Sequence, residues 1–229
     1  MSDHPEHPSI ELPDQKNYEV AYGLAYKLAA ERLISSAQIE ELCRRSGSLL
    51  IFENDQKAIR LSYLNSLYQV NLPDVSISKI GDTSPVELRD KILILHYMLT
   101  ASGRPLSGEL ISFKELGEGL AYYPTFAQRA IQPLITYFGA NPENMLESAQ
   151  LLGGVKSKLG DFAVTISAFN KVPLTLVVWR GDDEFPPNAN ILFDRYVLDY
   201  LPLEDLIVLC QTVVWKLVKY FQSIKGGRL

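Results

Sequence analysis

Residues 162–179, FAVTISAFNKVPLTLVVW, decide the fold class of this chain of 229 residues. In the first half, Phe162, Val164 and Ile166 alternate with smaller or polar residues, which is the two-residue period of a β-strand. VPLTLVVW is a second apolar run, and the Asn170-Lys171 pair between the two runs fits a two-residue turn. The stretch therefore predicts an antiparallel hairpin.

A second set of strands is expected earlier in the chain. SLLIF (48–52) and KAIRLSYL (57–64) are short apolar runs, and they predict a hairpin with a loop of about four to five residues. SLYQVNL (66–72) is a candidate third strand. Pro73 closes it, because proline cannot donate a ladder hydrogen bond.

Helical patterns fill the segments around these strands. ILILHYML (92–99) is apolar nearly all round, which predicts a central, buried helix. Ser84-Pro85-Val86-Glu87 marks its start, since it combines an N-cap residue, proline at the first helical position and glutamate three residues after the cap. We expect this helix to run to Ala101. The other expected helices cover residues 16–33, 37–45, 123–137 with a kink at Pro133, 141–153, and the segment after Pro202.

The first two helices carry more specific predictions. In the helix over residues 16–33, Val20, Leu24 and Leu28 recur along one face, which we expect to be buried. The next helix has a candidate capping box and a candidate stop residue, which are formed by Ser35, Gln38 and Gly47.

The order of these elements predicts the fold class. Strands come as hairpins separated by several helices and not in β-α-β alternation, so we expect an α+β fold with a small, mainly antiparallel sheet packed against the helices. Residues 1–15 contain three prolines and are interpreted as a mobile N-terminal tail. Residues 16–229 are expected to form a single domain.

Composition and charge argue against several classes of protein. The formal net charge is −5 and no basic block is present, so the chain lacks the cationic surface with which nucleic-acid binders neutralise phosphates. No apolar run approaches the roughly 18 residues of a membrane span, and the first residues do not resemble a secretory signal. Cys43 and Cys210 lie in apolar helical patterns and form no disulfide framework. We therefore expect a cytoplasmic protein that binds neither nucleic acid nor a membrane.

The stretch WRGDDEFPPNANILFD (179–194) follows the predicted hairpin and is rich in carboxylates. Adjacent side chains of an extended chain point to opposite sides, so the middle acid of the DDE run faces away, and Asp182, Glu184 and Asp194 remain as co-ligands of a divalent metal ion. Two interpretations stay open: a metal or acid–base site, or an exposed turn whose charges keep the end of the sheet solvated. Phe185 is expected to bury its ring and so to anchor the loop.

His96 and several aromatic residues are the other candidate site residues. A histidine on an apolar helix is either a base or metal ligand, or a core residue with satisfied hydrogen bonds. Tyr97, Phe113 and Tyr122 lie in or around a glycine-rich segment, where they either line a pocket for a flat ligand or pack at the edge of the core. The complete candidate set is His96, Tyr97, Phe113, Tyr122, Asp182, Glu184 and Asp194.

Three long and uncommon blocks of sequence carry a resemblance. They are HYMLTASGRPLSGELISFKEL, then AYYPTF with QPLITYFG, and then AFNKVPLTLVVWRGDDEFPPNANILFD with YLPLEDL. In this order they resemble a family of uncharacterised domains found mainly in anaerobic bacteria and archaea. The residues typical of that family occur here as His96, Tyr97, Gly103, Phe113, Gly181, Asp182, Glu184, Phe185 and Asp194.

The resemblance implies an anaerobic, cytoplasmic setting without supplying an established activity. Members of the family are similar to a segment found beside iron–sulfur domains of corrinoid-linked one-carbon enzymes, which implies a corrinoid or a tetrapyrrole as cofactor. This chain lacks the cysteine cluster that holds an iron–sulfur cluster, so we expect no such cluster of its own.

Two hypotheses about function follow. In the first, the chain is a binding or accessory module that holds a small-molecule cofactor or a partner protein in corrinoid, tetrapyrrole or one-carbon metabolism. In the alternative, it is a metal-dependent hydrolase or transferase that uses the acidic loop 182–194, with His96 as base or as orienting residue if the fold brings it near. The sequence contains no complete catalytic constellation, which favours the first hypothesis, and whether the chain is an enzyme stays open.

Overall fold

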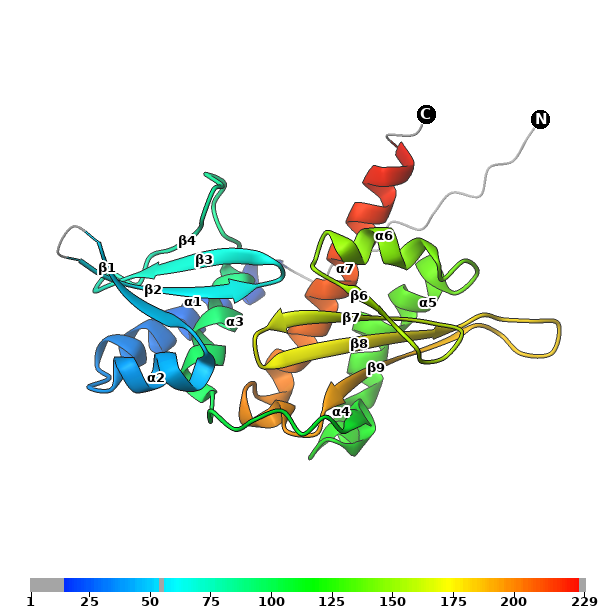
Figure 1. Ribbon diagram of the computed structural model, residues 1–229, viewed down its shortest axis with the longest axis horizontal. Helices are drawn as coiled ribbons and strands as arrows, with labels where there is room; N and C mark the ends of the chain where they lie inside the picture. Colours follow the sequence, from blue (N-terminus) through cyan, green and yellow to red (C-terminus); the bar gives the residue numbers. More distant parts are fainter. Residues whose placement is uncertain (1–14, 54–55, 227–229) are drawn as a thin grey trace.

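The structure, a computed structural model, describes residues 15–53 and 56–226 (Figure 1). Apart from Gln15, the expected N-terminal tail lies outside the described residues. The α-helices are α1 (Gln15–Ile34), α2 (Ile39–Ser46), α3 (Leu88–Thr100), α4 (Gly119–Phe126), α5 (Gln132–Phe138), α6 (Asn144–Gln150) and α7 (Leu203–Gly226). The strands are β1 (Leu49–Glu53), β2 (Gln56–Tyr63), β3 (Ser66–Asn71), β4 (Ile77–Lys79), β5 (Leu110–Ser112), β6 (Val155–Ser157), β7 (Phe162–Phe169), β8 (Val172–Trp179) and β9 (Asn188–Asp194).

The strands form one antiparallel sheet, which together with the helices confirms the predicted α+β class. Its order is β4-β3-β2-β7-β8-β9-β5, with β1 also paired to β2 and β6 to β7. The predicted hairpin is β7–β8, in which Phe169 pairs with Val172 across the Asn170-Lys171 turn. The predicted β1–β2 hairpin is also present, but its strands extend further into the expected loop, since Glu53 pairs with Gln56.

The sheet consists of two groups of hairpins that meet at a narrow junction. The register between β2 and β7 is the single pair of Tyr63 with Phe169. Figure 1 shows β1–β4 beside α1, α2 and α3, and β6–β9 beside α5, α6 and α7. The two groups are therefore joined mainly by side-chain packing at this junction and by the helices.

α3 and α7 are the most buried helices of the core. The apolar side chains of α3 are covered on several sides, because α3 contacts α1, α2 and α7. This confirms the expected central helix. Among the helices of the described residues, none combines the length and the hydropathy that a membrane crossing requires.

Two predicted helix starts are wrong. α3 begins at Leu88 and not at Pro85 after a Ser84 cap, because the Ser84 N–H donates to Asp82 Oδ1 at 2.9 Å and Glu87 has an extended ψ of 141°. The expected capping box before α2 is absent, since the Ser35 hydroxyl donates to the Arg32 carbonyl instead. The stop at the end of α2 is confirmed, because Gly47 has a φ of +69°, in the left-handed region.

The predicted buried face of α1 is also wrong. Leu24 and Leu28 are 58% and 52% exposed, whereas Ala29 and Leu33 are buried. The side chain of Val20 lies outside the described ones. α1 packs against α3 through the neighbouring face, so the sequence period identified a helix but not the side that is covered. Leu24 and Leu28 therefore remain on the surface of α1.

The helix expected over residues 123–137 is longer and is not simply kinked at Pro133. α4 and α5 are joined by a π-helical segment, η2 (Ala127–Ile131), and Pro124 lies inside α4. Pro133 lies in the first turn of α5, directly after η2. A wider π-turn between the two prolines accommodates both of them in one continuous helical run.

Four strands were not predicted. β4, β5 and β6 have three residues each, which is too short to show an alternating pattern. β9 does alternate, with Ala189, Ile191 and Phe193 buried, and it pairs along β8. Its position is central to the candidate site, because it separates the acids of the 179–194 stretch.

Candidate functional site

The acidic loop between β8 and β9 is closed by its own backbone. Asp182 Oδ1 accepts the N–H of Phe185 at 2.7 Å and that of Glu184 at 2.9 Å, and the Asp182 N–H donates to the Phe185 carbonyl at 2.9 Å. These hydrogen bonds, with the Phe185 N–H first, lower the pKa of the exposed Asp182 carboxyl. Asp182 therefore shapes a turn.

Phe185 does not anchor this loop as expected, because its side chain is 67% exposed. Close packing at the base of the loop comes from Gly181 instead. A Cβ atom at Gly181 would lie 2.6 Å from Pro187 Cδ, so only glycine fits there. The ring of Phe185 remains at the surface.

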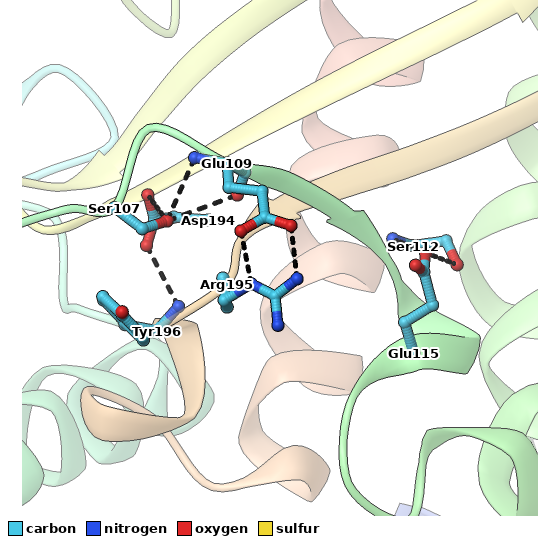
Figure 2. A network of polar contacts seen from close by, with 7 residues as sticks. All are labelled: Ser107, Glu109, Ser112, Glu115, Asp194, Arg195 and Tyr196. Carbon is cyan, nitrogen blue, oxygen red and sulfur yellow. Dashed lines mark hydrogen bonds and ion pairs between the residues drawn. The ribbon is translucent and has the colours of Figure 1, made fainter.

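Asp194 lies at the opposite end of β9 from the acidic loop. β9 begins at Asn188, and six steps of about 3.3 Å along a strand place Asp194 about 20 Å away. Figure 2 shows its carboxylate enclosed by the segment that follows α3. Oδ2 accepts the Ser107 hydroxyl at 3.0 Å and the Gly108 N–H at 2.9 Å, and Oδ1 accepts the Tyr196 N–H at 3.0 Å.

The three acids predicted as metal ligands are therefore not brought together. Both oxygens of Asp194 are occupied by hydrogen bonds, and Asp182 caps its own turn. Across residues 15–53 and 56–226, no group of three or more histidine, cysteine, aspartate or glutamate side chains is placed to hold a metal ion. The extended strand β9 separates Asp194 from Asp182 and Glu184, although all three lie in one short stretch of sequence.

Asp194 is a stabilising residue, and its replacement by asparagine is expected to show this in a pH-dependent way. Burial raises the pKa of this carboxyl, but the hydrogen bonds from Tyr196, Ser107 and Gly108 outweigh burial and lower its pKa overall. A lowered folded pKa means stabilisation that is present above the unfolded value of about 3.9 and is lost as pH falls through the folded pKa. Asp194→Asn should cost about 1.5–3 kcal/mol at pH 7.

Urea unfolding at pH 7 and at pH values below 4 measures this difference. The difference in the free energy of unfolding between wild type and Asp194→Asn should become smaller at the lower pH values, because the wild-type carboxyl becomes protonated there. Asp183→Asn, in the exposed acidic loop, is the matched control and should change stability by less than about 0.5 kcal/mol. A gap that stays constant with pH would contradict the assigned role of the charge.

The candidate aromatic residues do not share one pocket with the acids. Tyr97 is 1% exposed and stacks on Phe169, and Phe113 is fully buried and stacks on Phe126, so both belong to the core. Tyr122, on α4, is 37% exposed and lies by a shallow hollow of about 690 Å³ beside Gly117, Glu118, Leu120 and Ala121.

His96 is the candidate that opens onto a distinct groove. The groove has a volume of about 600 Å³ and lies between α1 and α3. Its lining residues are Ala25, Leu28, Ala29, Glu31, Arg32, Ser35 and His96. The β8–β9 loop projects from the end of the molecule away from α1 and α2, so His96 does not share a pocket with the acidic loop (Figure 1).

His96 is paired with an acid from a distant part of the chain. Its Nδ1 lies 2.6 Å from Asp205 Oδ2, in the first turn of α7, and the side chains of His96 and Asp205 are 28% and 15% exposed. An ionised carboxylate only accepts hydrogen bonds, so the pairing assigns a proton to Nδ1. For a neutral ring, the lone pair then lies on Nε2.

Neither Asp205 nor the α1 residues that line the groove were singled out as functional from the sequence. Asp205 is visible in the sequence only as an acid near a helix N-terminus, where it complements the helix dipole. Ala25 and Leu28 belong to a helix whose covered face was assigned incorrectly. No local signal pairs His96 with Asp205, because 109 positions separate them.

The two cysteines are free and buried. Burial, with a smaller contribution from Glu40, raises the pKa of Cys43 to about 11, and burial also raises the pKa of Cys210. Neither thiol is therefore activated as a nucleophile or metal ligand, because the thiolate is the reactive form. The His96–Asp205 pair remains as a partly buried polar pair of which His96 lines the groove beside α1.

Comparison with known proteins identifies a family and no activity. No curated protein and no solved structure matches the chain. Residues 38–216 match the family described as a domain of unknown function (DUF3786). The match includes α3 with His96 and the part of α7 that carries Asp205, whereas α1 precedes it. Because the match covers well over half of the sequence, the chain belongs to the DUF3786 family of domains of unknown function.

Proposed function

We propose that this chain is a cytoplasmic binding or accessory module that holds a corrinoid or tetrapyrrole cofactor in the groove between α1 and α3. In this role it serves one-carbon or related cofactor metabolism of an anaerobe. The module with its bound cofactor would then bind a partner protein. The single observation that carries the proposal is the His96–Asp205 pair, which presents an oriented imidazole to a partly apolar groove.

The residues of the groove fit a flat, mostly apolar ligand with polar substituents. Leu28 and Ala25 supply apolar surface, while Glu31 and Arg32 line the same groove with charged groups. Small-molecule sites typically combine a largely apolar lining with a few placed polar groups, in volumes of about 300–1,000 Å³. A guanidinium such as that of Arg32 is suited to ligand carboxylates or phosphates.

The alternative, a metal-dependent hydrolase using the acidic loop, receives no comparable support. Its three carboxylates are divided between the two ends of β9, and His96 lies on the α1 side of the molecule. Hydrolysis through a bound metal ion requires several ligands within about 2.6 Å of that ion. The binding module is therefore the function that the geometry favours.

A charge placed in the groove should weaken ring binding. We expect Leu28→Glu to raise the Kd for diaquacobinamide or ferric haem by at least about tenfold, because a carboxylate covered by a flat apolar ring loses its hydration. Absorbance titration of the purified protein measures this Kd. Leu24→Glu is the matched control, since Leu24 is similarly exposed on the same helix but does not line the groove.

The two variants separate specific from general binding. Equal Kd values for wild type, Leu28→Glu and Leu24→Glu would place any bound ring elsewhere on the protein. Absence of binding of both rings to the wild type would remove the cofactor from the proposal. Both leucines are more than half exposed, so neither substitution should prevent folding.

A further inference from the structure

We propose that the fold consists of two cooperative units whose junction opens as a hinge while both units stay folded. The first unit is α1–α3 with β1–β4, and the second unit is β5–β9 with α4–α7 (Figure 1). In the closed state, which the structure shows, side chains of the two units hold each other. This opening is independent of the proposed function, because it concerns the contact between the units and not a ligand.

The two units are contiguous in sequence, so the chain passes between them once, from α3 to β5. At the end of α3, the Ala101 N–H still donates to the Tyr97 carbonyl of the first unit at 3.0 Å. The next N–H, that of Ser102, donates to the Asp199 carbonyl of the second unit at 3.0 Å. The crossing is therefore very short and lies at the end of a helix, which is a common position for a hinge.

The contact between the two units is narrow. In the sheet, β2 and β7 share the single register pair of Tyr63 with Phe169. The ring of Phe169, from the second unit, stacks on two rings of the first unit, with centroid distances of 4.1 Å to Tyr97 and 4.8 Å to Tyr63. Relative motion is the normal expectation for two folded units unless a large apolar interface joins them.

Two charge pairs join α3 to α7 across the same junction. Lys216 Nζ donates to Asp90 Oδ2 at 3.2 Å, and His96 Nδ1 lies 2.6 Å from Asp205 Oδ2. Each pair takes one member from each unit, so an opening between α3 and α7 separates both pairs. His96 also lines the groove beside α1, so the opening connects that groove to the second unit.

One backbone amide reports directly on the opening. The Leu64 N–H, in the turn between β2 and β3, donates to the Ala168 carbonyl of β7 at 3.0 Å, and Leu64 is buried. Because this hydrogen bond crosses the junction, opening breaks it and leaves the ladder between β7 and β8 intact. Hydrogen exchange under native conditions distinguishes a partial opening of this kind from global unfolding.

The experiment follows amide exchange by NMR, residue by residue, in the purified full-length protein. In the wild type, the protection factor of the Leu64 amide should be at least about tenfold lower than those of the ladder amides of β7 and β8. Equal protection of Leu64 and of these ladder amides would overturn the hinge, because the junction would then open only when the second unit unfolds.

A disulfide across the junction distinguishes hinge opening from local fraying of the turn. A Cβ atom at Gly47, at the end of α2, would lie 3.7 Å from Asn170 Cβ in the turn between β7 and β8, a separation that suits a disulfide. In Gly47→Cys/Asn170→Cys, oxidation should slow exchange at Leu64 by at least about tenfold and leave the ladder amides of β7 and β8 unchanged. The reduced form of the same protein is the matched control, since it has the same strain at position 47, where φ is +69°.

Unchanged exchange at Leu64 after oxidation, with the disulfide confirmed by mass, would show that the turn frays by itself and would overturn the hinge. Asp205→Ala tests the junction without a disulfide. It removes one charge pair and should speed exchange at Leu64 by about threefold or more, the effect of losing one hydrogen bond. Glu204→Gln, at an exposed acid in the same first turn of α7, should leave this rate unchanged. Equal rates in Asp205→Ala and Glu204→Gln would overturn the role of the His96–Asp205 pair in holding the units together.

Discussion

Replacing Asp90 by alanine is expected to lower the free energy of unfolding by about 3 kcal/mol. Asp90 lies in the first turn of α3, and its side chain is 4% exposed. Its Oδ1 accepts the hydroxyl of Tyr63 at 2.8 Å, and its Oδ2 accepts Lys216 Nζ at 3.2 Å. The substitution would leave a fully buried phenol and a partly buried ammonium without their acceptor.

The expected cost lies at the lower end of the range of about 3–5 kcal/mol for breaking a buried ion pair. Lys216 is 31% exposed, so it can recover part of its hydration once Asp90 is gone. The Tyr63 hydroxyl has no such access, because burial, followed by the charge and hydrogen bond of Asp90, raises its pKa well above the ordinary value. Equilibrium unfolding in urea with unchanged m-values would measure the loss.

Asp90→Asn and Lys216→Met identify which contact of Asp90 matters. Asp90→Asn keeps an acceptor for Tyr63 and should cost less than Asp90→Ala. Lys216→Met leaves the carboxylate with only Tyr63 and should also destabilise the fold. If Asp90→Ala cost less than about 1 kcal/mol, the contacts of Asp90 would contribute no more than an ordinary exposed pair.

Local patterns predicted the parts of the fold in which the pattern spans a whole element. β7 and β8 have eight residues each around a two-residue turn, and their pairing needs no distant partner. The apolar run of α3 likewise predicted a buried helix. The three-residue strands β4, β5 and β6 exist because longer neighbours offer free backbone groups, and nothing within three residues encodes that pairing.

The site was harder to predict because its parts come from three helices. His96 was identified as a candidate from its chemical type and its apolar surroundings. Asp205 and the groove-lining residues of α1 depend on how α3 packs against α7 and α1, which no periodic pattern specifies. For the acidic loop, proximity in sequence suggested a cluster of carboxylates that the fold does not form. Asp194 lies at the end of β9 that is opposite to the loop.

Tyr97→Ala is expected to produce the largest loss of stability, about 3–5 kcal/mol, because it removes a large aromatic side chain from the core. The ring of Tyr97 stacks on Phe169 at 4.1 Å between centroids, and Phe169 stacks on Tyr63 at 4.8 Å. Phe169 and Tyr63 also form the register pair between β7 and β2. The stack of Tyr97, Phe169 and Tyr63, an aromatic column, thus joins α3 to both groups of hairpins at their narrow junction.

Tyr97→Phe separates the ring from the hydroxyl, which donates to the Ser46 carbonyl at 2.6 Å. It should cost only about 0.5–1.5 kcal/mol, the usual net value of one hydrogen bond. Tyr122→Ala, at an exposed position outside the column, should cost less than about 0.5 kcal/mol. Equal losses for Tyr97→Phe and Tyr97→Ala would show that the hydroxyl, not the stack, holds α3 in place.

The same pair of variants tests whether the core holds the groove in shape. His96 immediately precedes Tyr97 on α3, so the packing of Tyr97 fixes the direction in which the imidazole is presented. Tyr97→Phe keeps this packing and should bind cobinamide with a Kd within about threefold of wild type, a difference of less than about 1 kcal/mol. A larger increase in Kd, without matching loss of stability, would mean that Tyr97 acts on the groove through its hydroxyl, because the ring and its packing are retained.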